Sequence, residues 1–484
     1  MSEVFTTPEL LMASLIVALV LLEAFFAPGA SRVTANMGYA SLSGTLVVLA
    51  AALGWPSSAD PFSSYFTVLV LSCACLAVLI SLSGRGGAQL GGVSGRSSAS
   101  SRGMAFYPLL LCSVLGMMMM VRAQDLLLLF VSLELAALSL QALVICGESG
   151  RSGTVEAGIR LAFTGAVASG FFLLGLVLIY GATASINLIE IVTAHQQIGA
   201  GHSRLLLAGM AVLAVAVGAR AGVVPMHWWF PDAFQGAPTP VSALLASAAT
   251  AATVAVAMRL FAVGFDLTQD YAVTLISIVA ALTMTVGNLL AMNQRRLKRL
   301  LGYSSLAHLG YVLAGLTTLG AGGGGSVAFY MSFYGMAICG CCAVLLALRR
   351  ERQEELEIDD CLGLARKHPL LAGTLIALLL SLVGLPPTIG FTARYWVLSA
   401  TLEAGSGALA ICLLLNSLLM VYVYGRVVVR LIRPPKPGGG DLVAVHVDPP
   451  LAAALALMVL FTIGGGIWSQ PLVLAAREAA LFGW

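Results

Sequence analysis

The chain alternates between long apolar runs and short polar or glycine-rich stretches. About fourteen of the runs approach the ~20 residues that a helix needs to cross the hydrocarbon core of a bilayer. This pattern predicts an all-α polytopic membrane protein with about 14 transmembrane helices. The expected spans are residues 9–27, 37–54, 63–83, 104–121, 124–146, 158–181, 204–224, 239–263, 271–292, 300–319, 326–348, 369–401, 406–429 and 449–470.

Proline and glycine interrupt the seventh and twelfth spans, at residues 218–242 and 381–396. Lipid cannot replace a backbone hydrogen bond that proline removes, so such a break is tolerated only against protein or a water-filled cavity. Two broken helices in corresponding halves are typical of transporters built from internal repeats. The residues expected at the breaks are Pro225, His227, Pro231, Pro238, Pro386 and Pro387, with His227 expected to bond a carbonyl that the break leaves free.

The composition excludes other classes of protein. Hydrophobic residues make up 59% of the chain and charged residues 10%, against about 25% charged residues in soluble domains. The net charge is only +3 and the basic residues are dispersed, so no nucleic-acid partner is expected. The nine cysteines lie mostly inside apolar runs, and only Cys339 and Cys342 have CxxC spacing, which predicts packing residues and no metal site.

The distribution of basic residues predicts the orientation. With the N-terminus outside, the inner loops hold most of the 25 lysines and arginines, and the outer loops hold acidic residues such as Asp60 and Glu190. Both termini are therefore expected on the outer, periplasmic side of a bacterial plasma (inner) membrane. No basic residue precedes the first run, so it is expected to remain as a span and not to be a signal peptide. The Gly/Ser-rich stretch 83–103 is expected to be a flexible inner loop.

Few ionisable side chains lie inside the spans. A charge at mid-membrane costs at least about 3 kcal/mol, so each such side chain is a candidate functional residue and needs a partner. Glu134 lies centrally in the fifth span and Arg220 closes the seventh, which makes them the natural ion pair. This pair either serves transport or only locks helices together. The other candidates inside the spans are Arg160, Thr250, His308 and Arg394.

Some polar residues have a simpler interpretation. His308 is either part of a proton path or a packing histidine. Arg259 and Arg426 lie near span ends, where their side chains are expected to reach the membrane interface. Asp125, at the start of a span, is expected to be hydrated or to cap the helix.

The sequence resembles the N subunits (NuoN) of bacterial proton-pumping NADH–quinone oxidoreductases, the respiratory complex I family whose mitochondrial counterpart is NADH dehydrogenase subunit 2. The similarity extends from about residue 104 to the C-terminus, and the first hundred residues agree more in span count than in motif. The stretches that carry it are VVPMHWWFPDAFQGAPTPVSALLASA (223–248), VSLELAALSL (131–140), RRLKRLLGYSSLAHLGYVL (295–313) and GLARKHPLLAGTLIALLLSLVGLPPTIGF (363–391).

The resemblance implies two inverted five-helix repeats, formed by spans 4–8 and 9–13. The implied divisions are an N-terminal three-helix segment with the flexible inner loop (1–103), the first repeat (104–263), the second repeat (264–435) and a final helix with a tail (436–484). It also implies a polar axis at mid-membrane, a glutamate followed by three lysines. The corresponding positions here are Glu134, Arg220, Thr250 and Arg394, with Arg160 at a further lysine position and Lys298 retained.

The departures from the family pattern concern proton transfer. The three lysines of the chain, Lys298, Lys367 and Lys436, all lie in inner loops or at their edges. Burial can bring the pKa of a lysine near neutrality, whereas arginine stays protonated. Neutralising an arginine at pH 7 costs roughly 7.5 kcal/mol from its reference pKa. Arg220 and Arg394 are therefore expected to be fixed charges, not proton carriers.

The expected function is that of an antiporter-like membrane-arm subunit in a complex I-type oxidoreductase, contributing to proton translocation coupled to quinone reduction. The expected partners are other membrane-arm subunits and the lipid bilayer. No cofactor is expected in this chain, since the complex would hold FMN, iron–sulfur clusters and quinone elsewhere. Two alternatives remain open: a structural subunit that does not pump, and a subunit of a Mrp-type Na⁺/H⁺ antiporter.

Overall fold

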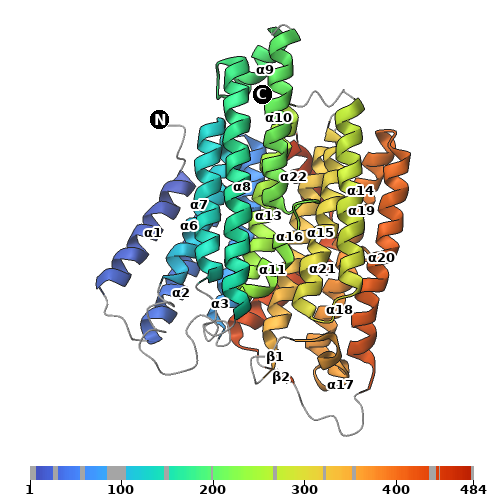
Figure 1. Cartoon of the computed structure of the whole chain (residues 1–484). Coiled ribbons are helices and arrows are strands. Elements are labelled where there is room, and N and C mark those ends of the chain that lie inside the picture. The colour runs from blue at the N-terminus through green and yellow to red at the C-terminus, as the bar shows by residue number, and fades with distance from the viewer. Residues whose placement is uncertain are drawn as a thin grey trace.

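The computed structural model describes residues 7–25, 31–54, 60–83, 105–145, 152–197, 200–264, 270–319, 323–350, 356–434, 443–445 and 447–480. These residues form a bundle of mostly upright helices, with α1 and α2 at one edge and α20 at the other (Figure 1). Within them, 10 helices are long and apolar enough to cross a membrane, and shorter apolar helices accompany them. The prediction of an all-α polytopic membrane protein is confirmed.

The helices of the first half follow the predicted spans. In order they are α1 (Thr7–Phe25), α2 (Ser31–Gly54), α3 (Pro61–Leu82), α6 (Phe106–Arg122), α7 (Leu126–Ile145), α8 (Ser152–Thr183), α9 (Leu188–Gln197), α10 (Ala200–Ala221), α11 (Trp229–Gly236), α12 (Thr239–Leu244), the π-helical turn η1 (Leu245–Ala249) and α13 (Thr250–Gly264).

The second half repeats the alternation of long and broken helices. Its elements are α14 (Asp270–Met292), α15 (Leu297–Leu316), α16 (Gly324–Ala347), β1 (Leu348–Arg350), the 3₁₀ turn η3 (Ile358–Cys361), α17 (Leu364–Lys367), α18 (Pro369–Val383), α19 (Ile389–Glu403), α20 (Gly407–Ile432), β2 (Val443–Val445), α21 (Pro449–Ile467) and α22 (Gln470–Ala480).

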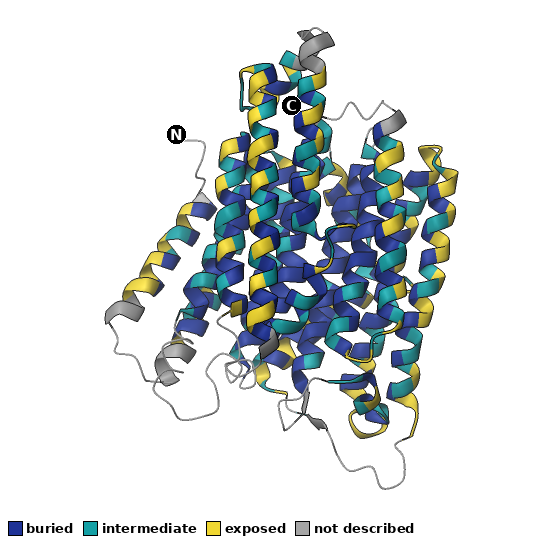
Figure 2. Cartoon of the chain, viewed as in Figure 1, coloured by how far each residue is buried: buried dark blue, intermediate teal, exposed yellow. Residues whose placement is uncertain are grey.

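The core of the bundle lies around α16 and α3. Helix α16 contacts α3, α12, α15, α18, α19, α21 and α22, and nearly all of its side chains are buried. The buried residues fill the centre of the bundle, and exposed residues gather on its outer helices (Figure 2). Many exposed side chains on these outer helices are leucine, isoleucine or valine, as on α8 and α20. An apolar exterior of this kind suits lipid or a neighbouring membrane protein.

Both predicted breaks are present. Helix α10 ends at Ala221 and α11 starts at Trp229, while α18 ends at Val383 and α19 starts at Ile389. Each first helix is followed at once by a glycine with a positive φ angle, Gly222 at 82° and Gly384 at 83°. This left-handed conformation is easy for glycine and strained for other residues, so it ends both helices at the same relative place.

The loops also contain short strands and a short helix. Strands β1 and β2 pair antiparallel, with Leu348 opposite Val445, and so join the segment after α16 to the segment before α21. The amphipathic segment after α8 forms α9, which lies at the opposite end of the bundle from β1, β2 and α17 (Figure 1). The expected flexible loop at 83–103 falls, apart from Ser83, outside the described residues.

The arrangement of the loops predicts a labelling pattern. Thr193 on α9 and Arg366 on α17 are exposed at opposite ends of the bundle. In intact cells, a membrane-impermeant maleimide should label Thr193→Cys, because the basic inner loops place α9 outside. It should label Arg366→Cys only after permeabilisation, with the unsubstituted chain as the background control. Labelling of Arg366→Cys from outside would reverse the predicted orientation.

Candidate functional site

The predicted contact between Glu134 and Arg220 is confirmed. The Arg220 guanidinium at the end of α10 forms an ion pair with the Glu134 carboxylate in the middle of α7. Ser169 of α8 completes the group, since its hydroxyl donates to Glu134 and accepts from Arg220 Nη2 at 2.7 Å. The Arg220 side chain is 11% exposed and that of Glu134 is 24% exposed. Three helices of the first half thus meet at one charged group.

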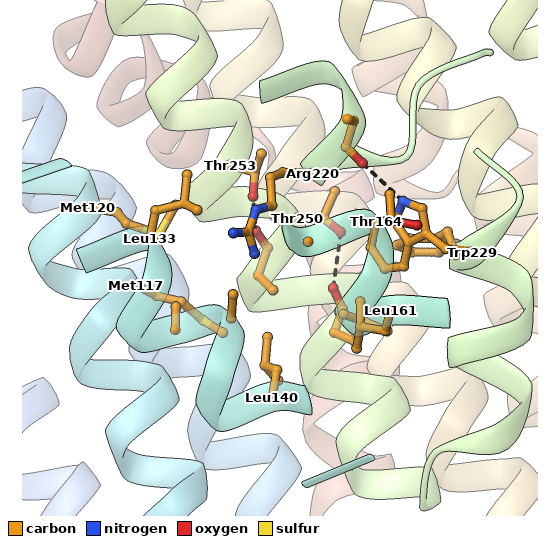
Figure 3. Close-up of a pocket in the computed structure, with 17 residues that line it drawn as sticks. Met117, Met120, Leu133, Leu140, Leu161, Thr164, Arg220, Trp229, Thr250 and Thr253 are labelled. Carbon is orange, nitrogen blue, oxygen red and sulfur yellow. Dashed lines mark hydrogen bonds between the residues drawn. The ribbon is translucent and has the colours of Figure 1, made fainter. Parts of the chain in front are cut away.

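A cavity lies directly beside this ion pair. It has a volume of about 60 Å³ open to the centres of water molecules. A single water needs about 10–15 Å³ of such volume, so the cavity has room for a few. Arg220 extends into it, with Met117, Met120 and Leu133 on one side and Leu161 and Trp229 on the other (Figure 3).

Thr250 lines the same cavity and follows an irregular turn. The π-helical turn η1 stands between α12 and α13, and the Thr250 hydroxyl donates to the Leu245 carbonyl at 3.1 Å. A π-turn adds a residue to one turn of a helix and is frequent at functional sites. No residue in this stretch predicts the π-turn, because leucine, alanine and serine are ordinary helix residues. Thr250 and Arg220 therefore share a cavity, although the threonine hydroxyl bonds its own helix.

Protein groups satisfy the backbone at the seventh-span break. The Ala219 carbonyl near the end of α10 accepts from the Trp229 indole at 2.9 Å, and the Val224 amide donates to the Thr283 hydroxyl of α14 at 3.3 Å. His227 Nδ1 lies 3.3 Å from the Pro225 carbonyl, as expected for a carbonyl that the break leaves free. The break is thus tied to α14 and to its own aromatic residues.

The other prolines occupy helix ends. Pro231 lies in the first turn of α11, where the amide that proline lacks would have no partner within the helix, and Pro238 immediately precedes α12. Pro386 and Pro387 lie in the gap between α18 and α19. A side chain on Gly466 of α21 would meet the Pro387 carbonyl oxygen at 2.0 Å, so α21 packs closely against this second break.

A second charged group lies where α8, α11 and α15 meet. Arg160 of α8 forms ion pairs with Asp232 of α11 and with Glu156, and Arg299 of α15 is 3.4 Å from the other oxygen of Asp232. Lys298 donates to the Ala237 carbonyl immediately after α11. Sequence reasoning missed Asp232, although an acidic residue inside a proline-rich membrane break was a usable signal.

Arg394 has a different environment from Arg220. It is 8% exposed, and its guanidinium donates to the Leu382 carbonyl at the end of α18 at 2.6 Å and to the Ser417 hydroxyl at 3.0 Å. Its Cζ lies 4.5 Å from the centre of the Tyr311 ring. In the described part of the chain no carboxylate pairs with Arg394. Backbone, hydroxyl and aromatic groups therefore stabilise this charge.

His308 lies near Arg394 in the second half. It is 1% exposed, on α15, and its Nδ1 is 2.8 Å from the Tyr330 hydroxyl of α16. The Tyr330 ring stacks on that of Tyr311, with centres 6.1 Å apart and planes inclined by 8°. The predicted candidates thus fall into three groups: Glu134, Arg220 and Thr250; Arg160 and Lys298 near Asp232; and His308 with Arg394.

The expectation for one helix-end arginine, Arg259, was wrong, and that for Arg426 stays a prediction. Arg259 was expected to reach the interface, but it is 3% exposed, pairs with Asp60 and donates to the Ala123 carbonyl at 2.9 Å. It thereby ties α3, α6 and α13 together. Arg426 donates to three carbonyls at the end of α14, including that of Ala291 at 2.8 Å. The expected cap at Asp125 is confirmed, since it accepts from the Leu128 amide at 2.6 Å.

Known proteins resemble this chain in both sequence and fold. Residues 123–420 match the family model described as NADH:quinone oxidoreductase/Mrp antiporter, TM. A relative from Trichlorobacter lovleyi, named NADH-quinone oxidoreductase subunit N, is 33% identical over 98% of this chain and 96% of its own. A chain of respiratory complex I from Thermus thermophilus superposes with a TM-score of 0.79 at 29% identity, covering 97% of this chain and 99% of that one.

A protein of low sequence identity shares the fold as well. A chain of the Mrp complex from Dietzia sp. superposes with a TM-score of 0.84 over 98% of this chain and 97% of its own, at 21% identity. The two structural matches therefore agree on the fold across nearly the whole length.

The geometry predicts energetic coupling between Glu134 and Arg220. Glu134→Gln and Arg220→Gln should each destabilise the protein, because each leaves a partly buried charge unpaired. The double variant should be milder than the sum of the two by about 0.5–3 kcal/mol. Thermal unfolding of the detergent-solubilised complex measures this difference. Arg433→Gln, which alters an exposed arginine, is the control. Strictly additive losses would show that the pair contributes nothing.

Proposed function

The chain belongs to the NADH:quinone oxidoreductase/Mrp antiporter family, and on this premise we propose that it acts as the antiporter-like N subunit in the membrane arm of a complex I-type NADH–quinone oxidoreductase. In this role it contributes to proton translocation coupled to quinone reduction. The observation that carries the proposal is the Glu134–Arg220 ion pair beside a cavity that water can occupy.

Glu134 is the group that takes up and releases the proton in this proposal. Its carboxylate accepts from Arg220 and Ser169, so a proton that arrives there replaces an ion pair by a neutral acid beside a fixed cation. Protonation weakens the hold on the guanidinium, and the adjacent cavity gives Arg220 room to move. The arginine then acts as an electrostatic gate, and water in the cavity carries the proton.

The free energy needed to deprotonate an arginine is too high for the arginines themselves to carry the proton. Moving one charge through a membrane potential of 100 mV involves about 2.3 kcal/mol. Neutralising arginine at pH 7 costs roughly 7.5 kcal/mol from its reference pKa. Arg220 and Arg394 therefore remain charged throughout the cycle. Thr250 has no pKa in a useful range, so its role is to line the cavity and hold water.

The first alternative is a structural subunit that does not pump. One observation favours it: the residues at the three lysine positions are two arginines and a threonine whose hydroxyl bonds its own helix. The second alternative is a Mrp-type Na⁺/H⁺ antiporter subunit. The similarity to the Mrp complex concerns the fold, whereas the relative from Trichlorobacter lovleyi, which is 33% identical over 98% of this chain, carries the oxidoreductase name. Purification with flavin and iron–sulfur subunits discriminates between the antiporter and the oxidoreductase.

The remaining assignments rest on the same proposal. The redox cofactors, FMN and iron–sulfur clusters, and the quinone site belong to other subunits of the complex. The chain lies in a bacterial inner membrane among other membrane-arm subunits, with both termini on the outer side. The partly exposed Glu134 and the exposed apolar side chains of α7 and α8 mark a face that a neighbouring subunit can cover.

The proposal predicts the proton ejection of the complex when Arg394 is replaced. Arg394→Lys should preserve proton ejection, because lysine keeps the positive charge beside Leu382 and Ser417. Arg394→Ala should lower turnover or the number of protons ejected per NADH, since it leaves the Leu382 carbonyl without its cation. Proton ejection per NADH by the complex in reconstituted vesicles measures both. Arg433→Ala, which removes an exposed arginine, is the control.

The same assay separates pumping from a structural role. If both Arg394→Ala and Glu134→Gln eject protons at the wild-type ratio and rate, this subunit does not pump and the structural alternative holds. A lower ratio in Glu134→Gln alone would place the path in the first half of the molecule.

A further inference from the structure

Two tyrosines of α16 flank the buried histidine of α15. Tyr330 and Tyr334 are four residues apart, which places them on the same face of the helix, one turn apart. The Tyr330 hydroxyl is 2.8 Å from His308 Nδ1, and the Tyr334 ring centre is 5.1 Å from that of His308. All three side chains are at most 2% exposed.

The second ring nitrogen of His308 is buried without a partner. Within the described part of the chain, neither His308 Nε2 nor the Tyr334 hydroxyl makes a hydrogen bond, although both are removed from solvent. A buried polar atom left unsatisfied costs about 1–3 kcal/mol. Two such atoms on adjacent rings mark a place where a proton donor or acceptor passes or a water binds.

On the Tyr330 side, the group of Tyr330, His308 and Tyr334 lies close to Arg394. The Tyr330 hydroxyl bonds His308, and the Arg394 guanidinium donates to the neighbouring Tyr311 hydroxyl at 3.4 Å. The Tyr330 ring stacks on Tyr311, whose hydroxyl is 2.7 Å from the Ser417 hydroxyl, which in turn accepts from Arg394. Arg394, Ser417 and Tyr311 thus form a polar group beside the Tyr330–His308 pair, in the half of the molecule where no carboxylate pairs with Arg394 among the described residues.

We propose that Tyr330, His308 and Tyr334 form a proton relay through α15 and α16, on the side of Arg394. This inference rests on the proposed proton translocation and names residues that would carry it in the second half. Tyr330 and Tyr334 are the members that the sequence did not single out.

The relay moves one proton without ionising a tyrosine. A proton from a water on the Arg394 side enters a lone pair of the Tyr330 oxygen, and the phenolic proton of Tyr330 passes to His308 Nδ1. The imidazole then releases its other proton from Nε2 to a water that bridges it to the Tyr334 hydroxyl, and Tyr334 passes its own proton to the next water. Each group gains one proton and loses one, and rotation of the hydroxyls and a change of histidine tautomer reset the chain.

Replacing each tyrosine by phenylalanine removes the hydroxyl and keeps the ring. The whole complex carrying Tyr330→Phe, Tyr334→Phe or both is reconstituted in vesicles, and proton flux and NADH oxidation are measured per assembled complex. The control is Tyr107→Phe, which removes another buried hydroxyl, one that accepts a hydrogen bond from Ser81 of α3. We expect each single variant to lower proton flux at least about twofold relative to this control, as for loss of a proton-transfer group.

The double variant tests whether the two tyrosines act in series. In one path the second substitution adds nothing, so the double variant should match the slower single variant. Proton transfer should also limit its residual flux more strongly, so the solvent deuterium isotope effect on flux should exceed that of the wild type, whereas a packing defect would leave this effect unchanged. Flux equal to that of Tyr107→Phe in both single variants, or losses that multiply in the double variant, would overturn the relay.

Glu134→Gln separates failure of the relay from failure of the proposed function. If Glu134→Gln lowers proton flux while the tyrosine variants do not, the subunit pumps by another path and the relay is wrong. If Glu134→Gln and both tyrosine variants all pump as the wild type does, the proposed pumping fails together with the relay.

Discussion

Inside a bilayer, every backbone carbonyl that a helix leaves free needs a donor from the protein, and cations supply several of these donors here. Lys298 bonds the carbonyl that follows α11, Arg394 bonds one at the end of α18, and Arg426 bonds three at the end of α14. The C-terminus of a helix carries a partial negative charge, so a cation there is stabilised twice, by the hydrogen bond and by the dipole. Buried cations, which would be costly in lipid, thus stabilise the helix ends.

This constraint gives the two halves different chemistry. Arg220 comes at the end of α10, but the Trp229 indole satisfies the Ala219 carbonyl there, and the guanidinium is left to pair with Glu134. Arg394 donates hydrogen bonds to the Leu382 carbonyl at the end of α18 and to Ser417, and its guanidinium lies over the Tyr311 ring. A guanidinium with five donors in a planar fork can make these contacts at once, which an ammonium group cannot do as well. The cost is that the charge is fixed, so proton uptake falls to other side chains.

The sequence was most informative where the residue types within one short segment determine the local structure. Proline and glycine located both breaks, and the scarcity of charges inside apolar runs singled out Glu134 and Arg220 as partners. The ion pair of Arg259 with Asp60 was missed because the two residues are 199 positions apart and each lies near a helix end, where a solvated side chain is the ordinary outcome. The π-turn before Thr250 was missed because nothing in its composition differs from an α-helix. Tyr330 and Tyr334 show helical spacing in the sequence, but their relation to His308 depends on how α15 packs against α16.

Fixed and titrating charges in contact are sufficient to couple a distant energy source to proton movement. Two opposite unit charges about 4 Å apart attract by roughly 4 kcal/mol at the effective dielectric constant near a protein surface. That is more than the ~2.3 kcal/mol of moving one charge through 100 mV. Protonating Glu134 removes this attraction, so a modest change in the local field can favour either the paired or the separated state of Arg220. An arginine serves this purpose better than a lysine, because it cannot relieve the imbalance by losing its own proton. The replacement of lysine by arginine is therefore compatible with pumping, provided that Glu134 and the groups around His308 carry the proton.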